Sequence, residues 1–112
     1  MIYFHGCGWI GGSKEGATLE LIPYLERGWN IVNIEYRKGK NIAPQVVDNA
    51  MRTISWVAEN VSRFNIDLEN IVISGNSAGD HLALITGLFN TIPDSHDCYV
   101  GNQLKVKAIL NW

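Results

Sequence analysis

Residues 71–79 of this 112-residue chain read Ile71-Val72-Ile73-Ser74-Gly75-Asn76-Ser77-Ala78-Gly79. The first residues are apolar and mostly β-branched, which is typical of a buried strand, and an apolar, helix-forming segment begins at Leu82. Between the two lies a Gly-x-Ser-x-Gly motif. A strand that turns sharply into a helix through this motif has the form of a nucleophile elbow, which lifts a serine hydroxyl above a sheet.

Gly75 and Gly79 flank Ser77 in this motif. We expect that a side chain at either position would collide with the neighbouring strand and helix. The N-terminus of the helix would direct its amides and its dipole at any negative charge that forms beside the hydroxyl. The motif alone is weak evidence, because a serine in a tight strand–helix turn can also simply cap the helix.

A glycine-rich loop at residues 5–13 supplies a second motif. It follows an expected strand at residues 1–4 and begins His-Gly-Cys-Gly-Trp. Such a backbone can turn several amide N–H groups toward one point, although glycine-rich loops also occur as simple tight turns. A loop of this kind directly after a strand is the expected companion of the elbow, as part of an oxyanion hole. The two motifs in this order favour a nucleophile at Ser77 over a helix cap.

The rest of the chain alternates between helix and strand patterns. Apolar residues at helical spacing predict helices over residues 15–27 and 44–64, and the apolar segment after the elbow predicts a third helix that should be buried. Residues 29–36 and 105–111 are predicted to be strands. The order β-α-β-α-β-α-β predicts an α/β fold, with a mostly parallel sheet and helices on both faces.

Composition narrows the class of protein. The chain is 46% hydrophobic and 18% charged with a formal net charge of -2, which fits one globular domain and gives no support to a nucleic-acid partner. No apolar run approaches the roughly 20 residues that cross a bilayer, so we expect no membrane span. Cys7 and Cys98 could form one disulfide, but nothing requires it and two free thiols are predicted; no Cys or His spacing suggests a metal site. The sequence indicates neither a compartment nor an oligomeric state.

Several co-linear segments resemble the α/β-hydrolase family, and within it the group of hormone-sensitive-lipase-like carboxylesterases. Residues 5–9 resemble the family's His-Gly-Gly-Gly-Trp loop, and residues 75–83 resemble its Gly-x-Ser-Ala-Gly-Gly-x-Leu-Ala elbow. Residues 35–37, 43–44 and 48–56 resemble the Tyr-Arg, Ala-Pro and Asp…Ala…Trp segments that lie between them. The resemblance covers nearly the whole chain and implies a partial α/β-hydrolase fold.

Position by position, the resemblance implies that Ser77 is the nucleophile that attacks an ester carbonyl. The backbone N–H groups of Cys7, Gly8 and Ala78 would bind the oxyanion of the tetrahedral intermediate, where such donors act on developing charge. The residues with implied structural roles in the two motifs are His5, Gly6, Gly75 and Gly79. The substrate would be a small-molecule carboxylic ester, and neither a cofactor nor a metal is implied.

The chain departs from the family pattern at two glycine positions. Cys7 replaces one glycine of the loop, which is tolerable if its φ angle allows, because the expected contribution there is a backbone amide. Asp80 replaces the glycine that follows the elbow. A carboxylate in the first turn of a helix suits the dipole, yet close to Ser77 it would oppose an oxyanion.

The family's general base and its carboxylate partner follow the nucleophile in the order Ser, Asp or Glu, His, on loops after later strands. His96 and the two aspartates beside it lie too early for these roles and are expected to form a solvated loop. His5 and His81 are expected to be structural. We therefore expect residues 1–112 to be the central part of a single α/β-hydrolase domain, without the acid, the base and the outer strands.

Three hypotheses about function follow. The first is a serine hydrolase that cleaves carboxylic esters, with formamide or peptide cleavage as alternatives on the same scaffold. The second is a non-catalytic fragment or inactive homologue without a general base. The third, nucleotide binding by the glycine-rich loop, is weak because the loop has neither Gly-x-Gly-x-x-Gly spacing nor a phosphate-loop lysine.

Overall fold

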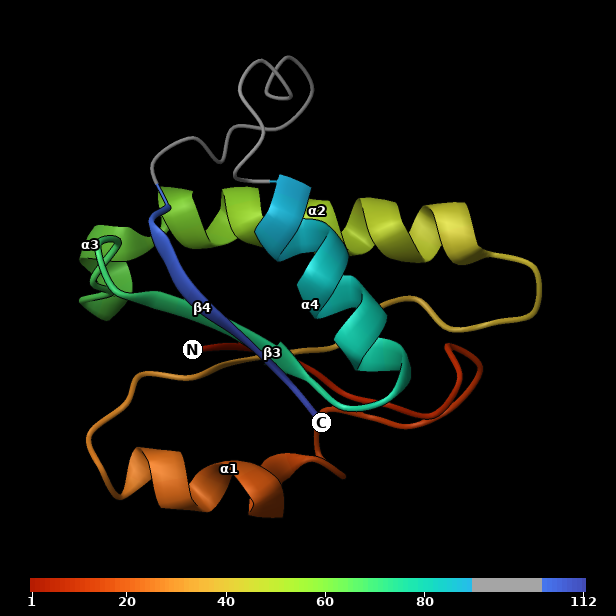
Figure 1. Ribbon diagram of the computed structural model, residues 1–112, viewed down its shortest axis with the longest axis horizontal. Coiled ribbons are helices and arrows are strands. Elements are labelled where there is room, and N and C mark those ends of the chain that lie inside the picture. The colour runs from red at the N-terminus through yellow and green to blue at the C-terminus, as the bar shows by residue number, and fades with distance from the viewer. Residues whose placement is uncertain (90–103) are drawn as a thin grey trace.

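The computed structural model describes residues 1–89 and 104–112 (Figure 1). The strands are β1 (Ile2–Phe4), β2 (Val32–Ile34), β3 (Ile71–Gly75) and β4 (Val106–Asn111). The helices are α1 (Thr18–Leu25), α2 (Ala43–Glu59), α3 (Val61–Phe64) and α4 (Ala78–Phe89). The alternation of strands and helices predicted from the sequence is confirmed.

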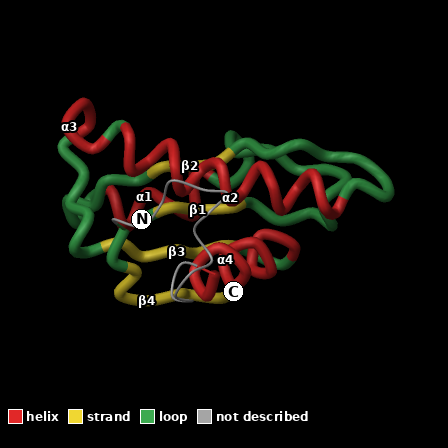
Figure 2. Tube along the Cα trace, turned by 90° about the horizontal axis from the view of Figure 1, so that it is seen from above, coloured by secondary structure: helices red, strands yellow, loops and turns green. Residues whose placement is uncertain are grey.

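The four strands form one parallel sheet in the order β2-β1-β3-β4, as Figure 2 shows. β1 pairs with both of its neighbours, so that Ile2 lies opposite Val32 on one side and Ile73 on the other. β3 pairs with β4 as far as Gly75, which lies opposite Asn111. Because every pair is parallel, the carboxyl ends of all four strands lie at one edge of the sheet. The loop after β1 and the turn after β3 therefore meet there.

Helices cover both faces of the sheet, with α1 on one face and α2 and α4 on the other (Figure 1). Alternate residues of a strand point to opposite faces, and β1 divides its side chains in this way. Ile2 and Phe4 belong to the larger core, which includes Val46 of α2 and Leu82 of α4. Tyr3 belongs to the smaller core beneath α1, whose buried members are Met1, Tyr3, Ala17, Leu21 and Val72.

Two predicted helices differ from the observed ones. The first was expected over residues 15–27, but α1 begins only at Thr18, and Leu19 at its start is 77% exposed. The second was expected to run unbroken from residue 44 to residue 64, but it divides into α2 and α3 at Asn60. The side-chain Nδ2 of Asn60 donates to the backbone oxygen of Trp56 at 2.9 Å. An asparagine side chain that bonds to nearby backbone competes with helical hydrogen bonding, which accounts for the break.

The expectation that the helix after the elbow is wholly buried was wrong. One side of α4 packs on the sheet, and its buried residues include Leu82 and Thr86. The other side carries Leu84, Ile85 and Leu88, and Leu88 is 55% exposed. A helix that lies on one face of a sheet keeps an outer side even where its sequence has few polar residues. The apolar sequence therefore indicated the packing of α4 but not its exposure.

The strands are shorter than predicted. β2 holds only residues 32–34 of the expected 29–36, and β4 begins at residue 106. Of the described helices the longest, α2, has 17 residues, and none is both long and apolar enough to cross a bilayer.

Candidate active site

Ser77 occupies the turn between β3 and α4 and is exposed to solvent. Its φ angle is 54°, which lies in the left-handed region. This conformation costs an L-residue roughly 1–2 kcal/mol, so the surrounding structure must hold it. Two backbone bonds close the turn: Gly79 N–H donates to Asn76 O at 2.8 Å, and Asp80 N–H donates to Ser77 O at 3.0 Å.

The two glycines of the motif lie where no side chain fits. A Cβ on Gly75 would stand 2.4 Å from the backbone carbon and oxygen of Gly79. A Cβ on Gly79 would stand 2.0 Å from the backbone oxygen of Phe4, at the end of β1. These neighbours are backbone atoms and cannot move aside. The motif thus allows β1, β3 and the start of α4 to approach one another closely.

The loop that follows β1 has an unusual backbone. Cys7, Gly8 and Trp9 are consecutive and all have positive φ angles, of 88°, 63° and 64°. Cys7 is exposed, with a free thiol, and a Cβ on Gly11 would lie 3.1 Å from its sulfur. The N–H of Gly11 donates to Cys7 O at 3.1 Å. The absence of a side chain at Gly11 therefore leaves room for the cysteine.

This loop lies directly against the elbow. A Cβ on Gly6 would stand 2.8 Å from Asn76 O and 3.4 Å from Ser77 Cβ. The indole nitrogen of Trp9 donates to Ala78 O at 2.9 Å. The structure therefore brings together the two segments that the sequence analysis singled out, although about 70 residues separate them.

His5 is buried at the start of the loop and contacts its backbone. It is 3% exposed, its Nδ1 lies 2.9 Å from Gly6 O, and its ring stacks on Tyr36 with 4.4 Å between the ring centroids. Since the carbonyl can only accept, Nδ1 carries the proton of this bond. The Tyr36 hydroxyl donates to His5 O at 2.6 Å. Burial, reinforced by the nearby Glu35 and Cys7, raises the pKa of Tyr36 to about 12.

Glu35 and Lys38, which follow β2, bind the C-terminal end of the glycine-rich loop. Its carboxylate accepts from Lys38 Nζ and, at 2.9 Å, from the backbone N–H of Lys14. Lys38 Nζ also donates to Gly12 O at 2.7 Å. Burial acts to raise the pKa of Glu35, but the bonds from Lys38 and Lys14 outweigh it and hold the pKa below its usual value. The sequence analysis did not assign Glu35 or Lys38 a role, although the resemblance of residues 35–37 to the family was a signal.

Four polar groups around the elbow are free of partners within the described residues. The hydroxyl of Ser77 forms no hydrogen bond there, so it does not cap α4. The backbone N–H groups of Cys7 and Gly8 donate no hydrogen bond to residues 1–89 or 104–112. Ala78 is the first residue of α4, and its N–H has no acceptor within the helix.

The histidines of the described part do not engage Ser77. His5 is buried beneath the loop, and His81 is exposed with its ring edge-on to Trp9 at 5.7 Å. No hydrogen bond among residues 1–89 and 104–112 joins either histidine to Ser77. His96, its neighbouring aspartates and Cys98 lie outside the described residues. Within the described residues no group of three or more Asp, Glu, His or Cys side chains could hold a metal ion.

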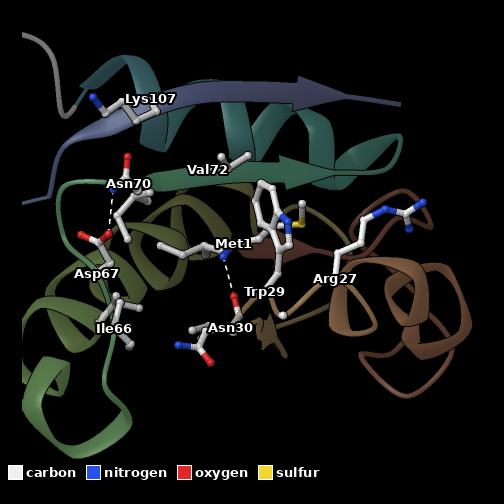
Figure 3. A pocket seen from close by; sticks show the side chains of 14 residues that line it. Met1, Arg27, Trp29, Asn30, Ile66, Asp67, Asn70, Val72 and Lys107 are labelled. Atoms are coloured by element: carbon white, nitrogen blue, oxygen red, sulfur yellow. Dashed lines mark hydrogen bonds between the residues drawn. The ribbon is translucent and has the colours of Figure 1, made fainter.

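Two cavities differ in their relation to Ser77. One of about 240 Å³ is lined by Gly6, Cys7 and Asn76, and so it adjoins the elbow. Another of about 490 Å³, seen in Figure 3, includes Met1 and Lys107 in its lining. Because those residues stand at the amino ends of the strands, this second cavity lies at the opposite edge of the sheet from Ser77. Of these two cavities, only the first adjoins the elbow.

The BD-FAE family model matches residues 1–112. The chain belongs to the BD-FAE family. The resemblance to hormone-sensitive-lipase-like carboxylesterases stated from the sequence is thereby confirmed.

The chain is 35% identical over 105 residues to the protein named Probable carboxylic ester hydrolase LipM from Mycobacterium tuberculosis. That match covers 92% of the chain and 24% of LipM, so the chain spans about a quarter of this relative. The solved structure of vibralactone cyclase has a TM-score of 0.82 and 26% identity, over 98% of this chain and 32% of that one. The solved structure of Thermogutta terrifontis esterase 2 phosphorylated by paraoxon has a TM-score of 0.74 and 28% identity. The match covers 97% of this chain and 43% of that one.

These similarities confirm two predictions made from the sequence. The BD-FAE chain has a partial α/β-hydrolase fold, and it belongs to a family of enzymes that includes carboxylic ester hydrolases.

Proposed function

We propose that this chain carries the nucleophile and the oxyanion hole of a serine hydrolase that cleaves small-molecule carboxylic esters. Residues 1–112 are then the central part of a single catalytic domain. The observation that carries the proposal is the set of free polar groups at the elbow: one unbonded serine hydroxyl and three unbonded backbone N–H groups among the described residues.

The proposed reaction begins when Ser77 Oγ attacks the ester carbonyl carbon and passes its proton to a general base. The carbonyl oxygen becomes an oxyanion and accepts hydrogen bonds from the backbone N–H groups of Cys7, Gly8 and Ala78. Collapse of this intermediate breaks the bond to the alcohol, which leaves with the proton from the base, and an acyl ester remains on Ser77. Water, deprotonated by the same base, then releases the carboxylic acid and the free serine. No cofactor or metal takes part.

The left-handed backbone of Ser77 supports this role. It carries the hydroxyl out of the sheet at the strand ends, where Gly6 and Trp9 of the loop are in contact with the elbow. The dipole of α4 also directs positive potential toward this point, because the helix begins at the next residue. The cavity beside Gly6 and Cys7 offers space for a small ester.

Serine needs a base at neutral pH, and the described residues offer none that bonds to Ser77. We propose that the general base and its carboxylate partner are supplied from beyond residues 1–112, as in the order Ser, Asp or Glu, His. His5 and His81 keep structural roles in this scheme.

Reaction with paraoxon tests the proposal, since a relative with the same fold is phosphorylated by it. Attack by Ser77 would form an Oγ–P bond and release 4-nitrophenolate, and mass spectrometry would locate the added diethyl phosphate. In a protein extended by the codons that flank the chain in the gene, we expect labelling at Ser77 and none in Ser77→Ala, while Ser62→Ala, which changes an exposed serine of α3, labels like the wild type.

The same assay separates an esterase from a non-catalytic protein. It should be run on the chain itself and on a protein extended by the codons that flank it in the gene. Labelling and ester hydrolysis that appear only in the extended protein place the base outside the chain. An extended protein that neither labels at Ser77 nor hydrolyses 4-nitrophenyl acetate supports a non-catalytic role. Formamide and peptide substrates, tested in parallel, show whether the same serine cleaves amide bonds instead of esters.

A further inference from the structure

Ser77, Asp80 and Trp112 form a closed ring of hydrogen bonds at the elbow. Ser77 N–H donates to the backbone oxygen of Trp112 at 3.3 Å, and Trp112 N–H donates to Asp80 Oδ1 at 3.2 Å. Asp80 N–H donates to Ser77 O at 3.0 Å, which completes the ring. Each residue donates once and accepts once. Figure 1 shows how the ring arises, because the end of β4 lies beside the turn from β3 to α4.

We propose that Asp80 is a positioning residue that holds the backbone of Ser77 in its left-handed conformation by fixing the end of β4 against the elbow. The proposal rests on the proposed function for the role of Ser77 as nucleophile. Its structural part, the effect of Asp80 on the backbone of Ser77, does not depend on that role.

The ring fixes the peptide groups on both sides of Ser77. Its N–H belongs to the peptide that precedes it, and its carbonyl belongs to the peptide that it shares with Ala78. In a planar trans peptide the N–H points away from the C=O. When Asp80 N–H binds Ser77 O, the N–H of Ala78 is therefore turned the opposite way. The ring thus sets both the φ angle of Ser77 and the direction of one proposed oxyanion donor.

The side chain of Asp80 supplies the one side-chain bond of the ring, which a residue without a side-chain acceptor would lack. Glycine, which the resembling family motif has at this position, offers no acceptor to Trp112 N–H. The carboxylate is a strong acceptor, since bonds to ionised groups are about twice as strong as neutral ones. It accepts from the backbone N–H of Trp112, the residue that follows β4, which gives the carboxylate a structural task beside the elbow.

Trp112 is itself held on the strand before the elbow. Its indole Nε1 donates to Ser74 Oγ at 3.1 Å, and Ser74 Oγ donates to Leu110 O at 2.8 Å. The backbone of Trp112 is therefore a fixed support for Ser77. Asp80 joins that support to α4.

Backbone NMR of the ¹⁵N-labelled protein tests the ring without any need for activity. In the wild type we expect the amides of Ser77 and Trp112 to exchange with solvent at least about tenfold more slowly than free peptide, and a strong intraresidue HN–Hα NOE of Ser77 to report its positive φ. Unprotected Ser77 and Trp112 amides in the wild type would overturn the proposal, whatever the variants do.

Three variants then test whether the side-chain oxygen of Asp80 is responsible for the slow exchange of these two amides. Asp80→Ala removes it and should raise exchange at Ser77 and Trp112 about fivefold or more, as the loss of about 1 kcal/mol implies. Asp80→Asn keeps a side-chain oxygen and should restore most of the protection. Asp67→Ala is the matched control, because Asp67 also accepts a backbone N–H, from Glu69, but far from the elbow. Equal exchange in Asp80→Ala and wild type contradicts the proposal.

The positioning role is read from the rate at which paraoxon labels Ser77 in the protein extended by the flanking codons of the gene. We expect this rate to fall about fivefold to tenfold in Asp80→Ala and to recover in Asp80→Asn. In a protein that hydrolyses esters, kcat should fall by a similar factor with KM within about twofold. If the amides of Ser77 and Trp112 exchange faster in Asp80→Ala but the labelling rate is unchanged, the positioning role is refuted. If the wild-type protein extended by the flanking codons of the gene never labels, the proposed function is refuted instead, and the NMR result on the ring still stands.

Discussion

The indole nitrogen of Trp9 donates a hydrogen bond of 2.9 Å to the backbone oxygen of Ala78, 69 positions later in the chain. One residue belongs to the loop after β1 and the other begins α4. The bond therefore joins the proposed oxyanion loop to the proposed nucleophile elbow. It also explains why a tryptophan, with a donor at the end of a large ring, suits this position.

Replacing Trp9 with phenylalanine tests this connection. Trp9→Phe keeps an aromatic ring but removes the donor, so we expect a loss of about 1 kcal/mol in the free energy of unfolding. Because the loop is then less firmly held, paraoxon labelling of Ser77 should slow by about fivefold or more. Denaturant unfolding and labelling kinetics measure the two effects. Trp29→Phe is the control, since Trp29 packs edge-on against Tyr24 away from the elbow. A labelling rate that Trp9→Phe leaves intact speaks against the connection.

A methyl group at Gly79 should be incompatible with the fold. The added Cβ would lie 2.0 Å from Phe4 O, and backbone on both sides prevents relief. We expect Gly79→Ala to lower the free energy of unfolding by about 3 kcal/mol or more. Gly16→Ala is the control, because its nearest contact would be Ser13 O at 3.4 Å, and it should stay within about 1 kcal/mol of the wild type. Similar unfolding curves for the two variants would contradict the inference that α4 and β1 approach too closely at Gly79 for a side chain.

The ion pair of Glu35 should make stability depend on acid pH. The bonds from Lys38 and Lys14 hold the pKa of Glu35 below its usual value of 4.5, so the folded state favours the ionised form. Glu35 therefore contributes stability above about pH 4.5 and loses that contribution as the pH falls through the folded-state pKa. We expect Glu35→Gln to lower the melting temperature at about pH 7 and to differ less from the wild type at about pH 3.

Glu59→Gln provides the control for this comparison, because Glu59 is an exposed carboxylate near the end of α2. Its effect on the melting temperature should be small at both pH values. A difference between Glu35→Gln and wild type that is constant with pH would mean that the carboxylate of Glu35 is not the group that titrates.

Tyr36 should make stability depend on alkaline pH. Burial, together with the charges of Glu35 and Cys7, raises its pKa from 10.0 to about 12. Its contribution is complete below about pH 10 and is lost as the pH rises through the folded-state value of about 12. Tyr36→Phe also removes the donor to His5 O, so it should cost about 1–3 kcal/mol at neutral pH. The difference in the free energy of unfolding between Tyr36→Phe and the wild type should shrink from about pH 10 to about pH 12. A difference that grows over this range would contradict the assignment of this pH dependence to Tyr36.

The parallel sheet and the meeting of the two motifs could be predicted from the sequence because both follow from local patterns. The apolar strand at residues 71–75 and the glycines beside Ser77 each have a direct steric meaning, and parallel strands place their carboxyl ends together. The break at Asn60 could not be read from apolar spacing, since that spacing continues through α3 while a side-chain bond ends α2. Local composition also overstated the burial of α4, which depends on what covers its outer side.

The hydrogen bonds around the site could not be predicted from the sequence, for a different reason. The bond from Tyr36 to His5 and the ring through Trp112 join residues that are close only once the sheet has formed. No periodicity marks such pairs. Asp80 shows this most clearly, because its position next to the elbow suggested an effect on the oxyanion, while the structure shows its carboxylate bonded to Trp112, just after β4.

The position of β1 between β2 and β3 has a consequence for synthesis on the ribosome. β1 is made before either neighbour, and β3 follows it by about 70 residues. During that interval one side of β1 has its β2 partner at most, while the backbone groups that will face β3 are open to any other strand. Pairing across so long a stretch of chain is slow. The nascent chain should therefore need protection, for example by a chaperone, until residues 71–75 have emerged.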